Sequence, residues 1–562
     1  MKKVASKIKS EFWNLVIIFE LILVAKIIIA LGLDGTFIYP DEVCIIRKAI
    51  YFSQNLNLDF SCTEIIKFPV GEPMPFYSLL LAPIYKFINN GQTAFYAALS
   101  LNSLLVSSLL FPLYWMAKKI TGKVKISYLI AALIVFLPSV VVYEKTMMTE
   151  TFYLFTFIWT IFFYAKSLEP KTKKSNKLKL AAVIFSLIGT MTRPFGFILP
   201  MSIIANEVFI AKRKKLFIAL FILSIGATAI LLEVFIVEGA VSTLISKRIA
   251  NLGNPDFPLM IYTAATQQLN SLTIGTFFIL TIVFIQYLTN KKNPLHKIKA
   301  FLIIYVLLNL AVSANHMLGY FIHGNENPVL IMRYIQTSIV AISFIGLAQL
   351  WTNKKFQKTS TQFTIITSII ILVLMTFRDV PVKFSFNLEF TKYYDDKIAA
   401  SKDLIASKEI LKYGLLPFAL ITYFLFIKGK NKAITIIIGI VFCIQSALTL
   451  EYLANQQIKP QFVQIFSEKD KTNISIVMEL NYDKYKGIIM KLFAETQHDL
   501  GIFASYSDVS VSLDHNDFDE SKFFAKSKYI ISPYNFNLQE SFIIKIPTEN
   551  ILLYVYERPE NS

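Results

Sequence analysis

The sequence predicts an all-α, polytopic membrane domain followed by a small α/β domain outside the cytoplasm. Of the 562 residues, 55% are hydrophobic and only 17% are charged, and the mean hydropathy is +0.54. Soluble enzymes of this length do not have such a composition. After residue 451, charges of both signs and short β-rich runs replace the long apolar segments. We therefore expect a membrane domain over 1–451 and a soluble domain over 452–562.

Apolar runs long enough to cross a hydrocarbon core of about 30 Å recur from residue 13 to residue 450. Backbone polar groups in lipid must be satisfied within each segment, so these runs are expected to be helices. We expect about thirteen spans of this kind: 13–33, 94–116, 126–143, 151–166, 180–192, 196–211, 216–237, 272–289, 299–314, 334–351, 363–377, 412–427 and 432–450.

The net charge is +18, and the basic residues that produce it lie in alternate gaps between the apolar segments. Because the basic residues do not form one patch, we expect no nucleic-acid partner. They cluster in alternate gaps, 2–9, 118–125, 166–179, 212–215, 291–299, 354–358 and 428–432, which the positive-inside rule places in the cytoplasm. The opposite gaps, 34–75, 144–150, 238–271, 315–333, 378–411 and the region from 452, are then extracytoplasmic. This predicts a multi-pass protein of the cell (plasma or inner) membrane, with its N-terminus inside and its C-terminus outside.

The first outer gap contains two adjacent carboxylates, Asp41 and Glu42, directly after Pro40. A carboxylate is suited to act as a general base, and this pair lies where a lipid-borne substrate would reach it. The preceding apolar segment has a basic start but no small-residue cleavage pattern, so we expect a retained anchor rather than a signal peptide.

Two charged residues, Glu20 and Lys26, lie inside this first apolar segment. Charged groups in lipid are costly and are therefore functional candidates. The alternative interpretation is that both face neighbouring helices and that Lys26 extends outward toward the membrane surface.

The segments 180–192 and 196–211 are short and are expected to form a hairpin. About thirteen residues rise only about 20 Å, so the turn 192–196 is predicted to stop inside the outer leaflet, where Pro194 and Gly196 interrupt the helix. Arg193 in this turn needs a partner. A lipid phosphate is one candidate; helix-end carbonyls, Glu144 or Glu150 are the others.

Five short motifs occur in a characteristic order: Pro40-Asp41-Glu42, the proline-rich stretch 73–83, the acidic stretch 143–150, Arg193-Pro194 and Met332-Arg333-Tyr334. In their order and predicted membrane side they resemble the polyprenyl-phosphate-sugar-dependent membrane glycosyltransferases of the GT-C type, which include protein O-mannosyltransferases and aminoarabinose transferases. The core of the resemblance covers 13–237, with a catalytic outer loop at 34–75.

The resemblance implies transfer of a sugar from a polyprenyl-phosphate donor by an inverting single displacement. In this family the acid of the first outer loop is the catalytic base, a role that carries over to Asp41, with Glu42 beside it. The cations expected to bind the donor phosphate are Arg333, Arg193, Lys67 and Arg47. Two departures are evident. Cys44 stands where the aminoarabinose branch usually has an arginine, with Arg47 a turn further on, and the basic residue that often precedes the proline-rich stretch is replaced near Pro73, which leaves Lys67 as the nearest preceding cation.

Glu150 and Glu144 are candidates for acceptor or metal binding. Some relatives use a divalent cation, so Mg or Mn held by Asp41 and Glu150 is one hypothesis. Glu150 is alternatively a plain helix N-terminal acid. A zinc site is not expected, because no His or Cys cluster has the required spacing. Cys44 and Cys62 share an outer loop, which permits a disulfide.

Two other functions remain open. A transporter or flippase of lipid-linked glycans would also be polytopic and basic inside, and would place polar groups on broken helices. An O-antigen-type polymerase or ligase would share the outer arginines without needing Asp41. For the transferase, we expect membrane lipids as partners and a glycan, lipid or protein as acceptor.

In the soluble domain, β-rich runs occur at 473–478, 528–532, 542–546 and 551–556, with a helical stretch at 483–496. This alternation predicts a small α/β layer.

Overall fold

The computed structural model describes 2–32, 40–56, 75–88, 91–169, 175–209, 279–289, 294–322, 335–352, 430–456, 474–477, 511–512, 529–532, 540–546 and 551–557, with single residues in 265–276 and 421–428. The predicted spans 216–237 and 363–377, and most of 412–427, lie outside these residues.

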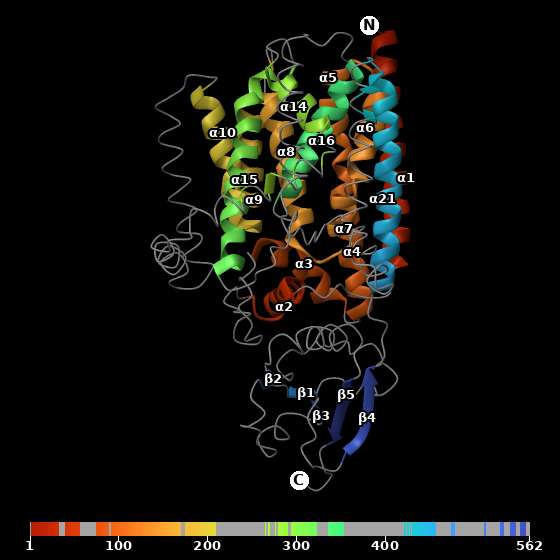
Figure 1. The fold of residues 1–562 in the computed structure, drawn as a ribbon, viewed down its shortest axis with the longest axis vertical. Coiled ribbons are helices and arrows are strands. Elements are labelled where there is room, and N and C mark those ends of the chain that lie inside the picture. Colours follow the sequence, from red (N-terminus) through yellow and green to blue (C-terminus); the bar gives the residue numbers. More distant parts are fainter. Residues whose placement is uncertain are drawn as a thin grey trace.

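The described membrane part is a bundle of roughly parallel helices (Figure 1). Its helices are α1 (Lys2–Leu31), α4 (Gly91–Ser108), α5 (Leu110–Thr121), α6 (Val124–Val135), α7 (Pro138–Glu144), α8 (Thr149–Ser167), α9 (Ser175–Thr192), α10 (Ile198–Phe209), α14 (Ile279–Thr289), α15 (Lys299–Ile322), α16 (Gln336–Thr352) and α21 (Asn431–Gln456), with the short 3-10 helices η1 (Pro194–Phe197) and η2 (His296–Ile298). Each predicted span within the described residues coincides with one or two of them.

Three described spans, Ser10–Leu31, Thr93–Thr121 and His296–Ala314, are long and apolar enough to cross a membrane. The predicted span 126–143 is a bent pair, α6 and α7, with an angle of 53° between them. Pro138 begins α7 and disfavours a helical conformation at the residue before it, which explains the break. The helical membrane fold agrees with the prediction, while the number of thirteen spans remains a prediction.

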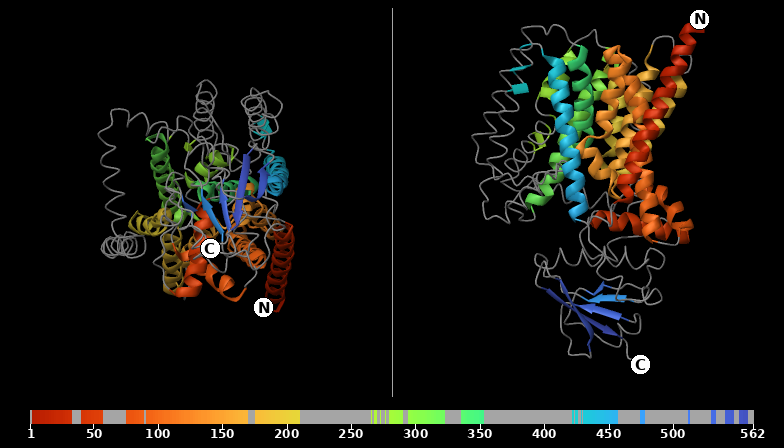
Figure 2. Two further views of the ribbon diagram at one scale, coloured as in Figure 1. Left: turned by 90° about the horizontal axis from the view of Figure 1, so that it is seen from below. Right: turned by 90° about the vertical axis from the view of Figure 1, so that its right-hand side faces the viewer.

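The first outer gap contains two helices that the sequence analysis did not predict, α2 (Pro40–Asn55) and α3 (Pro75–Phe87). They lie across one end of the bundle (Figures 1 and 2). Ile45, Ile46, Ala49 and Ile50 of α2 are buried in one cluster with side chains of α3 and α4. Because this i, i+1, i+4, i+5 spacing is the apolar face of an amphipathic helix, α2 is held on the bundle along one side.

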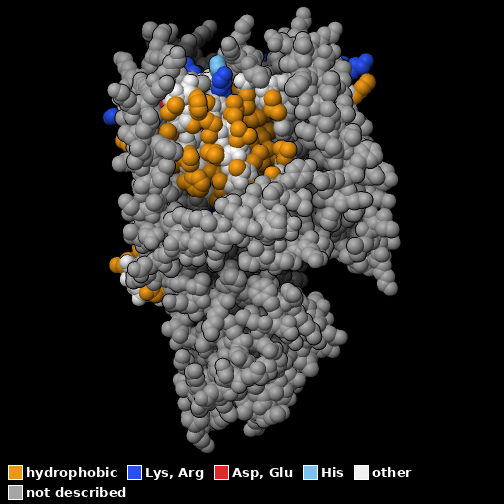
Figure 3. Space-filling view, turned by 60° about the vertical axis from the view of Figure 1, so that its left-hand side comes forward, with side chains coloured by type: hydrophobic (Ala, Val, Ile, Leu, Met, Phe, Trp, Pro, Cys, Tyr) orange, Lys and Arg blue, Asp and Glu red, His pale blue; other side chains and the backbone are white. Residues whose placement is uncertain are grey.

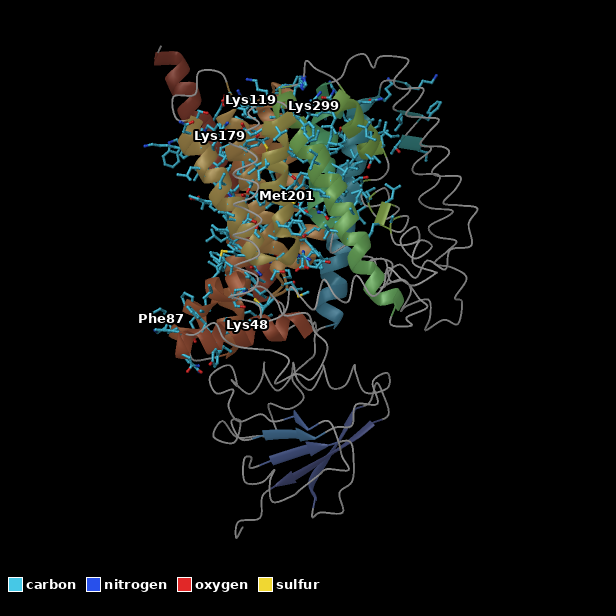
Figure 4. The ribbon with its side chains drawn as sticks, turned by 90° about the vertical axis from the view of Figure 1, so that its left-hand side faces the viewer. Lys48, Phe87, Lys119, Lys179, Met201 and Lys299 are labelled. Carbon is cyan, nitrogen blue, oxygen red and sulfur yellow. The ribbon has the colours of Figure 1, made fainter. Side chains whose placement is uncertain are left out.

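Lysines from the predicted cytoplasmic gaps lie together at one end of the bundle. Lys119, Lys179 and Lys299, from three of the predicted cytoplasmic gaps, lie at one end, whereas Lys48 of α2 lies at the other (Figure 4). On the face shown in Figure 3, hydrophobic side chains form a patch on the described part of the surface, with basic side chains at its upper edge. An apolar surface of this kind fits a membrane domain, and the cytoplasmic side of the lysine-rich end remains a prediction.

Beyond the bundle end that carries α2 and α3 lies a five-stranded sheet of order β2-β1-β3-β5-β4 (Figure 1). The strands are β1 (Ile474–Val477), β2 (Val511–Ser512), β3 (Tyr529–Ser532), β4 (Glu540–Ile546) and β5 (Ile551–Glu557). β1 pairs in parallel with β2 and β3, whereas β5 is antiparallel to β3 and β4. All four predicted β-rich runs coincide with strands, and β2 was not predicted. The predicted helix 483–496 lies outside the described residues, so the α/β class of this domain remains a prediction.

Candidate functional site

The acidic pair predicted to carry the chemistry begins helix α2. Pro40 is the first residue of this helix, with Asp41 and Glu42 directly after it. Proline is favoured at the first helical position because its fixed φ suits the helix and its missing N–H has no intrahelical acceptor there. Acidic residues in the first turn are also favourable to the helix dipole. The side chains of Asp41, Glu42 and Arg47 are outside the described part of the structure, as are Lys67 and Arg333 entirely.

α2 is fixed to the bundle by α3. The Ser78 hydroxyl of α3 donates a hydrogen bond to the Ile45 carbonyl of α2 over 2.9 Å. One residue earlier, the Tyr77 hydroxyl donates to Asn102 Oδ1 of α4 over 2.7 Å. The amide of Asn102 in turn donates to the Thr146 carbonyl over 2.9 Å. These bonds connect the helix that begins with the acidic pair to the turn between α7 and α8.

That turn is anchored by a buried charged cluster. Glu144, the last residue of α7, forms ion pairs with Lys26 of α1 and with Lys145, the latter at 2.9 Å. Ser103 of α4 donates to Glu144 Oε1 over 2.8 Å, and Lys145 Nζ also donates to the Lys26 carbonyl over 2.8 Å. All four side chains are buried. The expectation that Lys26 extends outward is therefore wrong, and the expectation that it faces neighbouring helices is confirmed.

The cluster depends on the carboxylate of Glu144, which both lysines contact. Two ammonium groups share one carboxylate, and Lys26 Nζ also lies 4.6 Å from the centre of the Phe136 ring. A buried ion pair is expensive to desolvate, and removing one partner leaves an uncompensated charge in an apolar environment. We infer a structural role for these residues: they set the point at which α7 ends and α8 begins.

A second buried pair joins α8 to the break after α9. Arg193 NH1 lies 3.3 Å from Glu150 Oε1, and Arg193 is only 6% exposed. The guanidinium carbon also lies 5.8 Å from the ring centres of both Tyr153 and Phe195. Of the partners considered from the sequence, the structure places Glu150 beside Arg193.

The backbone at the break leaves no room for a larger residue. The Gly196 N–H donates to the Arg193 carbonyl over 2.8 Å, and the Arg193 N–H donates to the Gly189 carbonyl over 3.2 Å. A Cβ atom at position 196 would lie 2.1 Å from the Gly189 carbonyl oxygen. Gly196 thus allows the turn to pack on α9, and this contact holds Arg193 at its position.

A polar network that the sequence analysis missed extends from Arg193 into the bundle. The hydroxyls of Tyr153 and Tyr305 are 3.2 Å apart, and Tyr305 OH is 2.6 Å from Thr337 Oγ1. Asn309 donates to the same Thr337 oxygen over 3.1 Å. Thr337 is the second residue of α16 and lies four residues after Arg333 in the sequence. Polar residues inside apolar segments were the available signal for this network.

Glu144 and Glu150, the two metal candidates whose side chains the structure describes, already contact cationic side chains. Both oxygens of Glu144 bind lysine ammonium groups, and Glu150 pairs with Arg193. Within the described residues no group of three or more His, Cys, Asp or Glu side chains is placed to hold a metal ion. Hard cations need several oxygen ligands without competing positive charge. We therefore derive no chemical step through a metal.

Comparison with known proteins identifies the fold. No protein-family model matches the chain, and no curated protein matches it. Among solved structures, it is similar to ArnT from Cupriavidus metallidurans bound to undecaprenyl phosphate, with a TM-score of 0.51 and 11% identity over 96% of this chain and 97% of that one. The apo state of the same protein gives a TM-score of 0.51 with 12% identity and the same coverage. The likeness shows a shared fold along nearly the whole chain and confirms the resemblance predicted from the motifs.

Proposed function

From the ArnT fold of this chain, we propose that it is a membrane glycosyltransferase that takes a sugar from a polyprenyl-phosphate donor and transfers it to an acceptor at the extracytoplasmic face. The observation that carries the proposal is the fold shared with ArnT over 96% of the chain, in a structure whose partner is undecaprenyl phosphate. The position of α2 supports a reaction at the extracytoplasmic face. Lys48 of α2 lies at the bundle end opposite Lys119, Lys179 and Lys299, which belong to the predicted cytoplasmic gaps (Figure 4).

The proposed reaction is a single displacement. The acceptor hydroxyl or amine attacks the anomeric carbon from the side opposite the phosphate, and the bond between that carbon and the phosphate oxygen breaks. Both electrons of this bond leave with the polyprenyl phosphate, and Asp41 takes the proton of the attacking group. This sequence inverts the anomeric centre and needs no further reactant. Positioned general bases of this kind contribute about 10²–10⁴-fold to rate.

Arg193 is the described residue best placed to receive the leaving phosphate. A guanidinium has five N–H donors in a planar fork, so it can keep its contact with Glu150 while binding phosphate oxygens. The buried Glu150 fixes the fork and offsets the cost of burying the cation. Arg333, Lys67 and Arg47 are proposed as additional cations, and Glu42 as the neighbour that orients one of them or the base.

Glu150 is fully buried beside Arg193 at the first turn of α8, so its role is proposed to lie on the donor side, through Arg193, rather than on the acceptor. The net positive charge of the Lys26, Glu144 and Lys145 cluster favours binding of an anionic donor nearby. Glu144 itself acts through position, since its two oxygens are already bound.

The test uses purified protein in liposomes with a panel of polyprenyl-phosphate sugars and candidate acceptors. Release of free polyprenyl phosphate together with formation of a glycosylated product supports the transferase, and loss of both in Asp41→Asn supports the assigned base. Movement of intact donor between leaflets without release would instead support the flippase alternative. Joining of oligosaccharides by the Asp41→Asn variant would support the polymerase or ligase.

A further inference from the structure

Glu20 lies near the middle of the apolar span of α1, on a side that the described helices leave open. This span, Ser10–Leu31, has 22 residues and a mean hydropathy of 2.6, and 17% of its most apolar stretch is buried, against 61% for Thr93–Thr121. The Glu20 side chain is exposed, and within the described part of the chain it has no hydrogen bond or ion pair. The expectation that Glu20 faces a neighbouring helix of this chain is therefore wrong for the described helices.

Glu20 belongs to a continuous stripe of exposed side chains along α1. The other large members are each 51–63% exposed: Trp13, Ile17, Val24, Ile28 and Leu31. Their spacing of three or four residues places them on one side of a helix. This spacing is also the seam along which two helices pack side by side. The stripe therefore has the shape of a helix-packing surface with one carboxyl group at its centre.

A carboxyl group at this depth requires a partner. Glu20 is about 15 Å along the helix from either end of the span, and its side chain is too short to reach the aqueous surface. Ionisable groups inside a membrane are costly unless they pair with one another or with other polar groups. The span has two other charged residues. Lys26 points into the bundle and pairs with Glu144, and Glu11 pairs with Lys118, so neither neutralises Glu20.

We propose that the Glu20 face of α1 docks a transmembrane helix of another membrane protein that carries a lysine or arginine at mid-membrane depth. Charge complementarity selects this occupant, because a cationic donor forms the strongest hydrogen bonds to a carboxylate. A second copy of this chain fits less well. Two copies in one membrane have the same orientation, so a symmetric α1 contact would place Glu20 against Glu20 at the same depth, and like charges in contact are unfavourable.

The proposal is tested with synthetic single-span peptides of leucine and alanine. One peptide has a central lysine and a photoreactive leucine one turn away, and its matched control has leucine in place of the lysine. The full-length protein is reconstituted in liposomes with each peptide and irradiated, and covalent adducts are counted and mapped by mass spectrometry. We expect at least fivefold more adduct with the lysine peptide, located on α1 between residues 13 and 31.

Glu20→Leu should remove the preference for the lysine peptide, and Glu20→Gln should reduce it while keeping a hydrogen-bonding group. Ile184→Ala, at an exposed position of α9, is the matched control and should leave the preference unchanged. Release of polyprenyl phosphate by Glu20→Leu in pure lipid should equal that of the wild type, which separates this test from the proposed reaction.

Equal adduct yields with the two peptides would overturn the proposal, as would a preference that persists in Glu20→Leu. A fluorescence-transfer signal between two labelled copies of the protein that disappears in Glu20→Leu would also overturn it, by identifying a second copy as the occupant.

Discussion

Lys26 of α1 pairs with Glu144 of α7, which lies 118 residues later in the chain, and both side chains are buried. Since Lys145 and Ser103 share the same carboxylate, this contact joins three helices at the turn that leads to Glu150. The first helix is therefore an integral part of the candidate site's framework as well as a membrane anchor.

Lys26→Met tests how much this contact stabilises the fold, with the exposed Lys118→Met as control. Lys26→Met leaves Glu144 paired with Lys145, so it should cost less than the about 3–5 kcal/mol of a change that leaves a buried charge unpaired. Glu144→Gln should cost more than Lys26→Met, because it leaves two lysines without a carboxylate. Thermal unfolding of the purified variants measures the effect.

Lys118 pairs with Glu11 but is 41% exposed, so its loss should cost at most about 1 kcal/mol. A Glu144→Gln variant as stable as Lys118→Met would contradict the structural role of the cluster.

Asp41→Asn should lower sugar transfer by about 10²–10⁴-fold while donor binding persists. Removing the base prevents proton uptake from the acceptor but leaves the phosphate contacts in place. Single-turnover release of polyprenyl phosphate measures the rate, and binding of a labelled donor measures the affinity. Glu42→Gln is the matched control and should lose less activity. Wild-type turnover by Asp41→Asn would exclude the mechanism.

Arg193→Lys should weaken donor use by about 10–100-fold in kcat/KM, which corresponds to losing one or two charge-assisted hydrogen bonds. Lysine keeps a positive charge beside Glu150 but cannot contact the carboxylate and a phosphate through a planar fork. The effect should appear in the KM for the donor and in weaker inhibition by free polyprenyl phosphate.

Lys179→Gln serves as the control for Arg193, because Lys179 lies in the first turns of α9 and pairs with Glu207, whereas Arg193 follows the last residue of that helix. If both variants change the donor KM equally, Arg193 has no specific role in phosphate binding.

Gly196→Ala should destabilise the break between α9 and α10 and reduce activity together. The added Cβ would lie 2.1 Å from the Gly189 carbonyl oxygen and 2.5 Å from Thr190 Cα. Both are backbone atoms that cannot move aside alone, so a cost of about 2–3 kcal/mol is expected. Gly439→Ala is the comparison, since its new contact is a Leu133 side-chain carbon at 3.3 Å. Equal melting temperatures for the two variants would argue against a rigid turn.

The predicted topology is testable by cysteine labelling in a background without native cysteines. Asn55→Cys, at the exposed end of α2, should react with a membrane-impermeant maleimide in intact cells. Lys123→Cys, in a basic gap, should react only after the membrane is opened. Both positions are exposed, so access depends on the side of the membrane. Labelling of both only in opened cells would place Asp41 in the cytoplasm and exclude the proposed donor geometry.

The parts of this fold that were predicted correctly depend on local properties of the chain. The length of an apolar run determines whether a helix can span the membrane, and Pro194 and Gly196 mark the break at Arg193 without reference to any distant residue. The strand 551–556 was likewise visible from its own residues. The helix α2 was missed because its apolar face is diluted by polar residues, so that its average hydropathy resembles that of a loop.

The contacts within the candidate site were harder to predict from the sequence. The sequence indicated that Lys26, Arg193, Glu144 and Glu150 needed partners, but each pair depends on the relative rotation and height of helices far apart in the chain. The bond between Tyr153 and Tyr305 depends on the same geometry. Composition and periodicity do not determine that geometry. The cluster at Glu144 is therefore seen only in the structure.

The pairing of Lys26 with Glu144 also bears on how the protein is made. At about 5–20 residues per second, a ribosome takes about 6–24 s to synthesise the 118 residues that separate them. During that interval α1 enters the bilayer before the partner of its lysine has been made. Because Lys26 lies five residues before the end of α1, its long side chain is expected to extend to the membrane surface until α7 arrives and buries it.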